Sequence, residues 1–406
     1  MTNVSHILRF ARPTHTCKLW FALLNTFTRH TRQTMSAEEA EGRMSSLYAD
    51  KGRTALHENI VDTHPPFDLL VIVPVYNAER FIAQCVQSVM SQHTQYNVKA
   101  VFINDGSTDS SLNLLRLSLE KWTDDDNARA KNDNVTPIRA GIIDQPNRGV
   151  SAARNAALRH IDARYVMFVD ADDILPANTF QHLLDVARKT HADVVEGTMN
   201  AFTDEELKGP TVVSHTDNED TRHISGYACG KLIRSTLLRH IAFPEGYRYE
   251  DTILSFLVFP QARRMATTAT TTYLYRQHAD SFTSAETTHN PAILDAYWVA
   301  RQMMKDAIAL GLMGEKNDRE RNNGMGTNTS SAHIQAEIYD AFLHGMKLSG
   351  ARLLTLGDDV CQAYFAAMCH LAATCFEGCH SHQYRQIDKA VHHHDFTRYI
   401  LASQLL

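Results

Sequence analysis

The sequence predicts an α/β protein with a mixed, mainly parallel sheet flanked by helices, followed by a helical C-terminal part. Apolar runs of strand length alternate with segments of helical spacing between residues 69 and 197, which is typical of βαβ units. Polar clusters follow several of these runs, where a parallel sheet places its ligand site. From about Pro291 the patterning is mostly helical.

The individual elements follow from length and periodicity. "LLVIVPV" is a strand by its length and its β-branched residues, and the helices show apolar residues at helical spacing. Two polar stretches, 123–134 and 203–222, are predicted as surface loops. The predicted strands are 69–75, 98–103, 138–143, 165–169 and 193–197. The predicted helices are 79–92, 109–121, 150–160 and 176–190.

Length and composition set the domain organisation. The 406 residues suffice for two domains, and an apolar content of 44% supports a large core. We expect a basic, poorly ordered N-terminal extension (1–66), an α/β domain (67–284) and a helical region (285–406) with a flexible segment at 314–332. The net charge is −6 with both signs interspersed, which argues against a nucleic-acid surface.

Cysteine usage and the N-terminus bear on location. The seven cysteines are scattered, which predicts reduced thiols and a cytoplasmic protein. The segment before Glu38 is basic and lacks acidic residues. Such a segment suits an anionic membrane surface, a transit peptide, or an extension upstream of a start at Met35, which is the reading we favour. Peripheral association with the inner face of the membrane stays open.

The stretch "YVMFVDADD" ends a predicted buried strand with Asp170, Asp172 and Asp173. Carboxylates this close repel one another, so a bound cation would compensate them. Hard oxygen ligands at a strand end suit Mg²⁺ or Mn²⁺. The alternative is that Asp172 or Asp173 caps the helix behind Pro176.

Two other strand ends carry candidate ligand contacts. Tyr76 follows the first strand, where an aromatic ring could pack on a base or sugar. Asp105 ends the second strand and could accept a hydrogen bond from a base, whereas Asp109 is better explained as a helix cap.

The third strand is followed by "DQPNRGVSAARNAAL". Gly149 and Ser151 open a helix whose free amide groups favour an anion. Arg154, one turn further on, could contact a phosphate. The alternative is a solvated arginine on an amphipathic helix.

A late cluster completes the candidates. Glu250 and Asp251 precede a strongly apolar segment, where Asp251 could cap a helix, act as a general base, or do both. Arg276 and His278 could meet a diphosphate, and His278 could meet the metal. The alternative for this pair is a surface position without a ligand.

Taken together, these segments resemble the family 2 glycosyltransferases of the GT-A fold. The likeness covers roughly residues 68–283. The segments that carry it occur in the family's order: "VPVYNAERFI", "NDGSTDSS", "QPNRGVSAARNAAL", "YVMFVDADDIL", "GKLIRSTLLRHIAFPEGYRYEDT" and "YLYRQHADSFTS".

The resemblance implies an inverting transferase with a nucleotide-sugar donor, a UDP-sugar first of all, and a glycan or lipid-linked acceptor. It implies Asp251 as the catalytic base, Glu250 beside it at the acceptor site, and Mn²⁺ or Mg²⁺ held by Asp172 and His278. Donor-binding residues implied in the same way are Pro74, Val75, Tyr76, Asn77, Glu79, Asp105, Asn147, Gly149, Ser151, Arg154, Asp170, Ala171, Asp172 and Arg276.

Outside roughly residues 68–283, which carry the resemblance, the sequence contains fewer functional signals. The "QxxRW"-type segment of processive members is missing from the sequence, which favours single additions. The C-terminal part is rich in cysteine and histidine, but Cys375 and Cys379 lack the usual zinc spacing, so helical packing is the expectation. That part could carry acceptor recognition, membrane contact or self-association into a homo-oligomer.

Two rival functions remain. "DADDI" nearly fits the signature of haloacid dehalogenase-like phosphatases, with Asp170 as nucleophile and Asp172 as acid, but this leaves "VPVYN" and "NDGSTD" unexplained, and "GDDVCQ" lacks the last aspartate of the later motif. The other rival is a non-catalytic scaffold that binds a nucleotide or glycan. Retention of Asp170, Asp172 and Asp251 argues against it.

Overall fold

The structure is a computed structural model that describes residues 34–129, 136–204, 209–278, 290–314 and 329–404. The chain forms two compact units. The sheet unit comprises Ala55–Gly246 and Gln261–Ala285, and the helical unit comprises Met1–Thr54, Tyr247–Pro260 and Glu286–Leu406. Each is described separately below.

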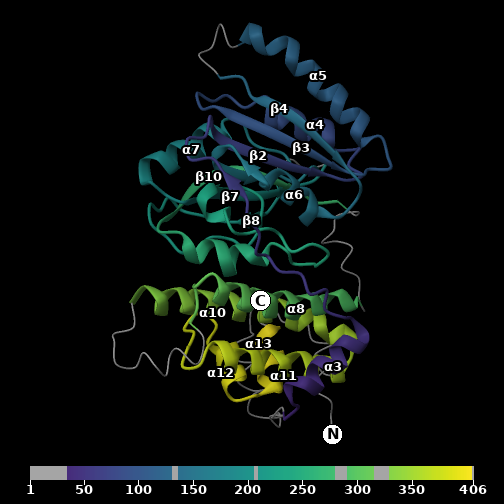
Figure 1. Cartoon of the computed structure of the whole chain (residues 1–406), viewed down its shortest axis with the longest axis vertical. Coiled ribbons are helices and arrows are strands. Elements are labelled where there is room, and N and C mark those ends of the chain that lie inside the picture. Colours follow the sequence, from purple (N-terminus) through teal and green to yellow (C-terminus); the bar gives the residue numbers. More distant parts are fainter. Residues whose placement is uncertain (1–33, 130–135, 205–208, 279–289, 315–328, 405–406) are drawn as a thin grey trace. The chain divides into compact units, whose positions relative to one another are not determined.

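The sheet unit is built on an eight-stranded sheet (Figure 1) of order β10-β7-β9-β6-β2-β3-β4, with β8 paired to β7. β9 is antiparallel to β6 and β7, and β8 is antiparallel to β7, whereas the other neighbours pair in parallel. The strands are β2 (Phe67–Val75), β3 (Val98–Asp105), β4 (Arg139–Gln145), β6 (Ala163–Phe168), β7 (Val194–Phe202), β8 (Thr211–Val213), β9 (Lys231–Arg234) and β10 (Met265–Arg276); β1 (Ile60–Val61) and β5 (His160–Ile161) form a separate pair.

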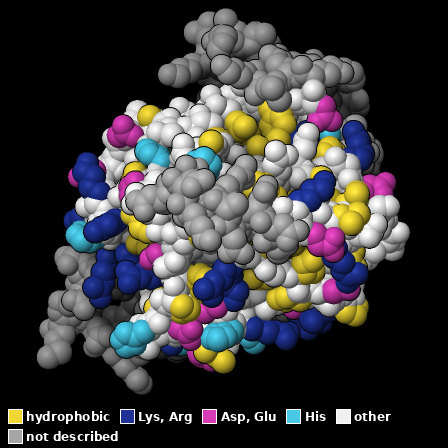
Figure 2. Space-filling view, turned by 90° about the horizontal axis from the view of Figure 1, so that it is seen from above, with side chains coloured by type: hydrophobic (Ala, Val, Ile, Leu, Met, Phe, Trp, Pro, Cys, Tyr) yellow, Lys and Arg dark blue, Asp and Glu magenta, His cyan; other side chains and the backbone are white. Residues whose placement is uncertain are grey.

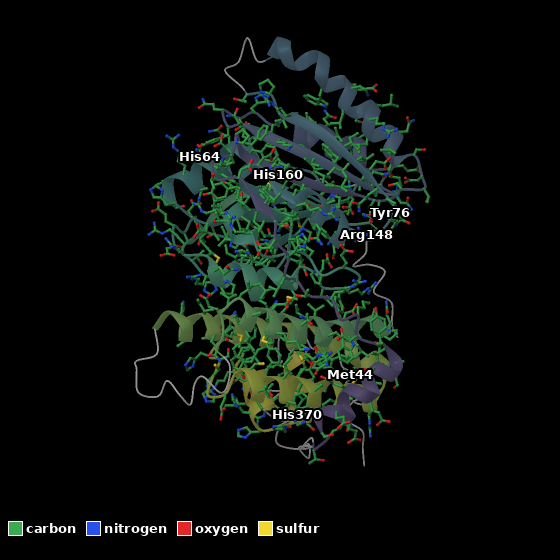
Figure 3. The ribbon with its side chains drawn as sticks, in the orientation of Figure 1. Met44, His64, Tyr76, Arg148, His160 and His370 are labelled. Carbon is green, nitrogen blue, oxygen red and sulfur yellow. The ribbon has the colours of Figure 1, made fainter. Side chains whose placement is uncertain are left out.

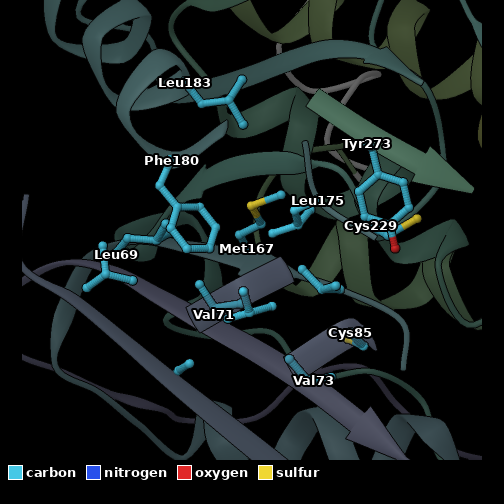
Figure 4. Close-up of a cluster of buried hydrophobic side chains, with 14 of the residues drawn as sticks. Leu69, Val71, Val73, Cys85, Met167, Leu175, Phe180, Leu183, Cys229 and Tyr273 are labelled. Carbon is cyan, nitrogen blue, oxygen red and sulfur yellow. The ribbon is translucent and has the colours of Figure 1, made fainter. Parts of the chain in front are cut away.

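Both faces of the central strand β2 are buried, since Leu69 to Val73 are each at most 1% exposed. Strands that are buried on both faces have continuous apolar sequences. Figure 4 shows Leu69, Val71 and Val73 beside Met167 of β6 and Phe180 of α7. The helices of this unit are α4 (Ile82–Met90), α5 (Ser111–Arg129), α6 (Val150–Leu158) and α7 (Thr179–Thr190), with η1 (Ser235–Leu238).

The sequence prediction was right about the alternation and wrong in two loops. Helix α5 continues to Arg129, so the first half of the predicted loop 123–134 is helical. The second predicted loop, 203–222, contains β8, which pairs with β7. Strands β9 and β10 were not predicted as strands, because they lie beyond the regular alternation of βαβ units.

The helical unit contains part of the predicted N-terminal extension. Helix α3 (Ala37–Leu47) contacts α11 and buries Met44 (Figure 3). Arg301 forms ion pairs of 2.6 Å with both Glu41 and Asp50. The helices are α3, α8 (Asp295–Ala309), α10 (Thr329–Leu353), α11 (Asp358–Cys375), α12 (Arg385–His392) and α13 (Phe396–Ser403), with short turns η2 (Leu254–Val258), η3 (Phe259–Gln261), η4 (Pro291–Leu294) and η5 (Leu354–Leu356).

The division into units therefore differs from the predicted boundaries at residues 66 and 284. Residues 37–54 and 247–260 are grouped with the helical unit, and the predicted flexible segment 314–332 lies mostly outside the described residues. Among the described helices, none is long and apolar enough to cross a membrane. Charges of both signs are interspersed on the face drawn in Figure 2.

A buried ion pair joins β7 to β9. The Lys231 Nζ lies 2.9 Å from Glu196 Oε1, and both side chains are at most 2% exposed. His215 lies 2.8 Å from the same carboxylate, and the Ser225 backbone N–H donates to it over 2.7 Å. Burial raises the pKa of Glu196, but Lys231 and these hydrogen bonds outweigh it and lower the pKa to about 2.

We predict that Lys231→Met destabilises the sheet unit by about 3–5 kcal/mol, because it leaves a buried carboxylate without its cation. Lys189→Met, which removes an exposed pair with Glu219, is the control and should leave stability unchanged. Hydrogen exchange of the 194–202 peptide measures both effects.

The pKa of Glu196 is lowered from 4.5 to about 2. Glu196 therefore stabilises the unit fully above about pH 5 and loses this effect as the pH falls to 2. Equal hydrogen exchange in Lys231→Met and Lys189→Met would contradict the stabilising role of the buried ion pair.

Candidate active site at the strand ends

The order of the strands creates a switch point. The chain runs from β2 outward to β3 and β4, then returns to β6 on the other side of β2. The carboxyl ends of these parallel strands lie at one edge of the sheet, where ligands bind in open α/β sheets. Tyr76 and Arg148, labelled in Figure 3, belong to the loops after β2 and β4.

The loops after β2 and β3 are tied together by side chains of the predicted donor site. Asn77 has a left-handed backbone, with φ 47°. Its N–H donates to Ser107 Oγ over 3.1 Å, and its Oδ1 accepts from the Thr108 N–H over 2.8 Å. Glu79 also accepts a backbone N–H of the second loop. Asn77 and Glu79 thus shape the site, whereas the ring of Tyr76 is half exposed.

Asp105 is buried at the end of β3, with 2% exposure. Its Oδ1 accepts from Gln145 Nε2 over 2.7 Å and from the Arg148 N–H over 3.0 Å. Its Oδ2 accepts from the Gly149 N–H over 2.7 Å. The contacts in the structure therefore position the loop that leads into α6. Gln145 was missed by sequence reasoning, since only the register of β3 with β4 brings it beside Asp105.

The same loop approaches β3 closely at Gly106. A Cβ on Gly106 would lie 2.5 Å from the backbone N of Asn147, and the backbone φ there is +66°. No side chain fits at that distance from a backbone atom.

Helix α6 starts at the site. Gly149 is its N-cap, and Ser151 is buried in its first turn. Arg154 is 5% exposed, and its Nη2 lies 3.3 Å from Asp170 Oδ1. Its guanidinium carbon lies 5.0 Å from the centre of the Phe243 ring. The reading of Arg154 as a solvated surface arginine is therefore wrong.

The three aspartates after β6 are in different surroundings. The side chains of Asp170 and Asp172 are 36% and 31% exposed, whereas Asp173 is 1% exposed. Asp173 accepts from the Tyr273 hydroxyl over 2.6 Å and from the Arg276 N–H over 2.8 Å. Burial raises its pKa, and the charges of Asp170 and Asp172 raise it further. The sequence prediction offered Asp173 as a possible cap for the helix behind Pro176 and did not include these contacts.

The loop after β6 reaches β10, which lies three strands away in the sheet. Ile174 and Leu274 form an antiparallel bridge with N–H to O distances of 3.0 and 3.1 Å. This bridge brings the end of β10 to the aspartates. His278 Nε2 lies 3.0 Å from Asp172 Oδ2, and its ring centre is 4.7 Å from that of Phe81.

Arg276 is buried at the end of β10, with 2% exposure. Its Nε donates to the Asp172 carbonyl over 2.7 Å, and its Nη2 donates to Gln84 over 2.6 Å. Its Nη1 pairs with Asp204, and the guanidinium lies over the Phe202 ring. These contacts hold the backbone of the acidic loop. Gln84 and Asp204 carried no sequence signal, since neither lies in a polar cluster at a predicted strand end.

The donor set fits a divalent cation. Asp170 and Asp172 offer partly exposed carboxylates, and His278 contacts one of them. Carboxylate oxygens suit Mg²⁺ and Mn²⁺, whose other positions are filled by phosphate and water. The remaining predicted donor residues lie at the same strand ends: Pro74 and Val75 in β2, Asn147 before α6, and Ala171 between the two aspartates.

Asp251 and Glu250 belong to the helical unit. Tyr249, immediately before them, has φ +60°, which is rare for a bulky residue. The neighbouring Arg248 N–H donates over 2.9 Å to Asp295, whose carboxylate also lies 2.7 Å from Lys51 Nζ. Burial raises the pKa of Asp295, while these partners lower it. Asp295 was missed by sequence reasoning.

Comparison with known families matches residues 70–231 to the family described as "Glycosyl transferase family 2". Residues 70–231 form a glycosyltransferase family 2 domain. This match favours a glycosyltransferase over the phosphatase reading of "DADDI". It ends at Lys231, before β10 and the segment that contains Asp251.

Individual relatives agree with this family. Glycosyltransferase GlyA of Streptococcus pneumoniae is 30% identical over 45% of this chain and 27% of its own length. The minor teichoic acid biosynthesis protein GgaB of Bacillus subtilis is 26% identical over 44% of this chain and 19% of its own length. The matches thus span about a quarter of these relatives or less.

Among solved structures, residues 1–349 of S. aureus TarS in complex with UDP-GlcNAc give a TM-score of 0.60 at 18% identity, covering 83% of this chain and 90% of TarS 1–349. This likeness confirms the predicted fold class, the mainly parallel GT-A-type sheet flanked by helices with a helical C-terminal region.

Gly106→Ala tests the closely packed loop of this family 2 site. We expect it to lower the free energy of unfolding of the sheet unit by about 1–3 kcal/mol, because both the positive φ and the approach to Asn147 oppose a Cβ. Gly141→Ala is the matched control, since a Cβ there meets nothing within 4 Å. Urea unfolding followed by hydrogen exchange of the β3 and β4 peptides measures the difference. A neutral Gly106→Ala would refute the close approach.

Proposed function

We propose that this protein transfers a sugar from a nucleotide-diphosphate donor, a UDP-sugar, to a hydroxyl of a glycan or lipid-linked acceptor. The observation that carries the proposal is the acidic cluster after β6, at the switch point of a family 2 domain. Asp170 and Asp172 lie there beside Arg154 and His278. A buried arginine and a paired-carboxylate cluster suit a diphosphate bridged by a cation.

The donor would lie along the strand ends. The half-exposed Tyr76 ring would pack on the base, beside Val75 and the loop held by Asp105. The N-terminus of α6, with Gly149 and Ser151, supports binding of an anion. UDP is the first choice because TarS was crystallised with UDP-GlcNAc.

A divalent cation, Mn²⁺ or Mg²⁺, would be held by Asp172 with Asp170 and His278 nearby. When bound it would neutralise charge on the departing diphosphate. Arg154 would add a fixed positive charge on the α6 side of the cluster. Arg276 would act mainly by fixing the Asp172 backbone, through the bond from its Nε.

We further propose inversion in one displacement, with Asp251 taking the proton of the acceptor hydroxyl and Glu250 beside it. This role rests on the motif "YEDT" and on general base chemistry, which contributes about 10²–10⁴-fold. GgaB supports cell-envelope polymers as the acceptor class. A cytoplasmic location, peripheral at the membrane, fits a lipid-linked acceptor.

The test combines calorimetry and a transfer assay on the full chain. We expect one nucleoside diphosphate of a panel, UDP first, to bind with Mn²⁺ at least about tenfold more tightly than without it, since a cation held by Asp172 would offset the charge of the diphosphate. Asp172→Ala should remove this dependence. Asp251→Asn should bind the donor normally but lose about 10²–10⁴-fold in transfer.

Asp220→Asn serves as the control, because Asp220 is an exposed aspartate of the sheet unit outside the strand-end cluster. Binding that ignores both Mn²⁺ and Asp172→Ala would contradict the metal role. Normal donor binding with unchanged pathway output in Asp251→Asn would favour the scaffold function instead.

A further inference from the structure

A second group of metal-ligand side chains lies in the helical unit, apart from the proposed donor site. His380, Asp388 and His392 bring one ligand atom each within 4.8 Å of one another. Asp388 and His392 are four residues apart on α12, so they share one face of that helix. His380 comes from the turn between α11 and α12.

The spacing of these atoms matches a metal site better than hydrogen bonds. Asp388 Oδ2 lies 3.6 Å from His380 Nδ1, and Asp388 Oδ1 lies 3.3 Å from His392 Nε2. Both distances are long for an N–H···O bond. Ligands about 2.0–2.1 Å from a tetrahedral zinc lie roughly 3.3–3.5 Å apart. The two distances end on different oxygens of Asp388 and are close to that spacing, so this one carboxylate lies within reach of both imidazoles.

The surroundings of the carboxylate are those of a metal ligand. Asp388 is 6% exposed and accepts from the Tyr339 hydroxyl over 2.9 Å. Ligating carboxylates are commonly held by such an outer hydrogen bond. The two imidazole rings lie close together, with centres 4.6 Å apart and planes tilted by 42°. A buried carboxylate between two imidazoles is a donor set that zinc favours.

One contact competes with the metal. His392 Nε2 also lies 3.0 Å from the Cys379 carbonyl. A proton on that nitrogen donates to the carbonyl, and a metal must displace it. Metal binding therefore requires the tautomer with its proton on Nδ1, so that Nε2 offers its lone pair to the ion.

We propose that His380, Asp388 and His392 bind one zinc ion, with water in the fourth position. The site joins the turn after α11 to α12 and stabilises the helical unit when loaded, because an ion that binds only the folded state shifts the unfolding equilibrium. The sequence prediction set zinc aside because it weighed the spacing of Cys375 and Cys379. This site uses neither thiol.

The test uses the full chain without a histidine tag, dialysed against a chelator. Zinc is titrated in competition with a chromophoric chelator, and the melting temperature is measured with and without zinc. We expect one tight site per chain, an affinity loss of at least about tenfold in His380→Ala and Asp388→Asn, and a zinc-induced rise in melting temperature that both variants lose.

His382→Ala and His393→Ala are the matched controls, since both are exposed histidines of the same segment. His380 is 67% exposed, so His380→Ala should melt like the wild type in chelator, which separates lost binding from lost folding. Cobalt adds a second readout, because a tetrahedral site gives intense visible absorption that His380→Ala should abolish. Equal zinc affinity in His380→Ala and His382→Ala, or no site that competes with the chelator, would overturn the proposal.

Discussion

The buried carboxylate of Asp173 is the interaction on which the proposed active site depends. It accepts the Tyr273 hydroxyl and the Arg276 N–H, both from β10, although β10 and β6 are not neighbours in the sheet. Tyr273 in turn accepts the Asp170 N–H over 3.1 Å. A buried acceptor satisfied in this way fixes the whole loop, since leaving it unpaired would cost free energy.

Because Asp173 is buried, the three aspartates have different surroundings and different proposed roles. With Asp173 turned into the protein, Asp170 and Asp172 are the partly exposed carboxylates of the loop. Arg154 approaches Asp170 from α6, and His278 approaches Asp172 from the end of β10. The electrostatic repulsion among the three carboxylates is lowered by the Arg154 guanidinium beside Asp170 and by burial, which raises the pKa of Asp173.

Much of this could be predicted from the sequence, because the strands of a parallel sheet are apolar runs and their polar ends are local signals. Asp170, Asp172 and Arg154 were proposed as site residues in that way. Gln145, Asp204 and Asp295 were missed because their roles arise from register and from contacts between distant segments. Asp105 was expected to contact a base and Arg276 a diphosphate. Both instead bond to protein groups that tertiary packing brings near. The positions of the side chains around Asp388 likewise depend on packing within the helical unit.

The central claim is that the acidic cluster binds cation and diphosphate together. Electron paramagnetic resonance of free Mn²⁺ in titrations of the full chain, with and without UDP, measures this coupling directly. The account predicts that saturating UDP tightens Mn²⁺ binding at least about tenfold and that Mn²⁺ tightens UDP binding by the same factor, as linkage requires. Mn²⁺ affinity that is unchanged by UDP would contradict it.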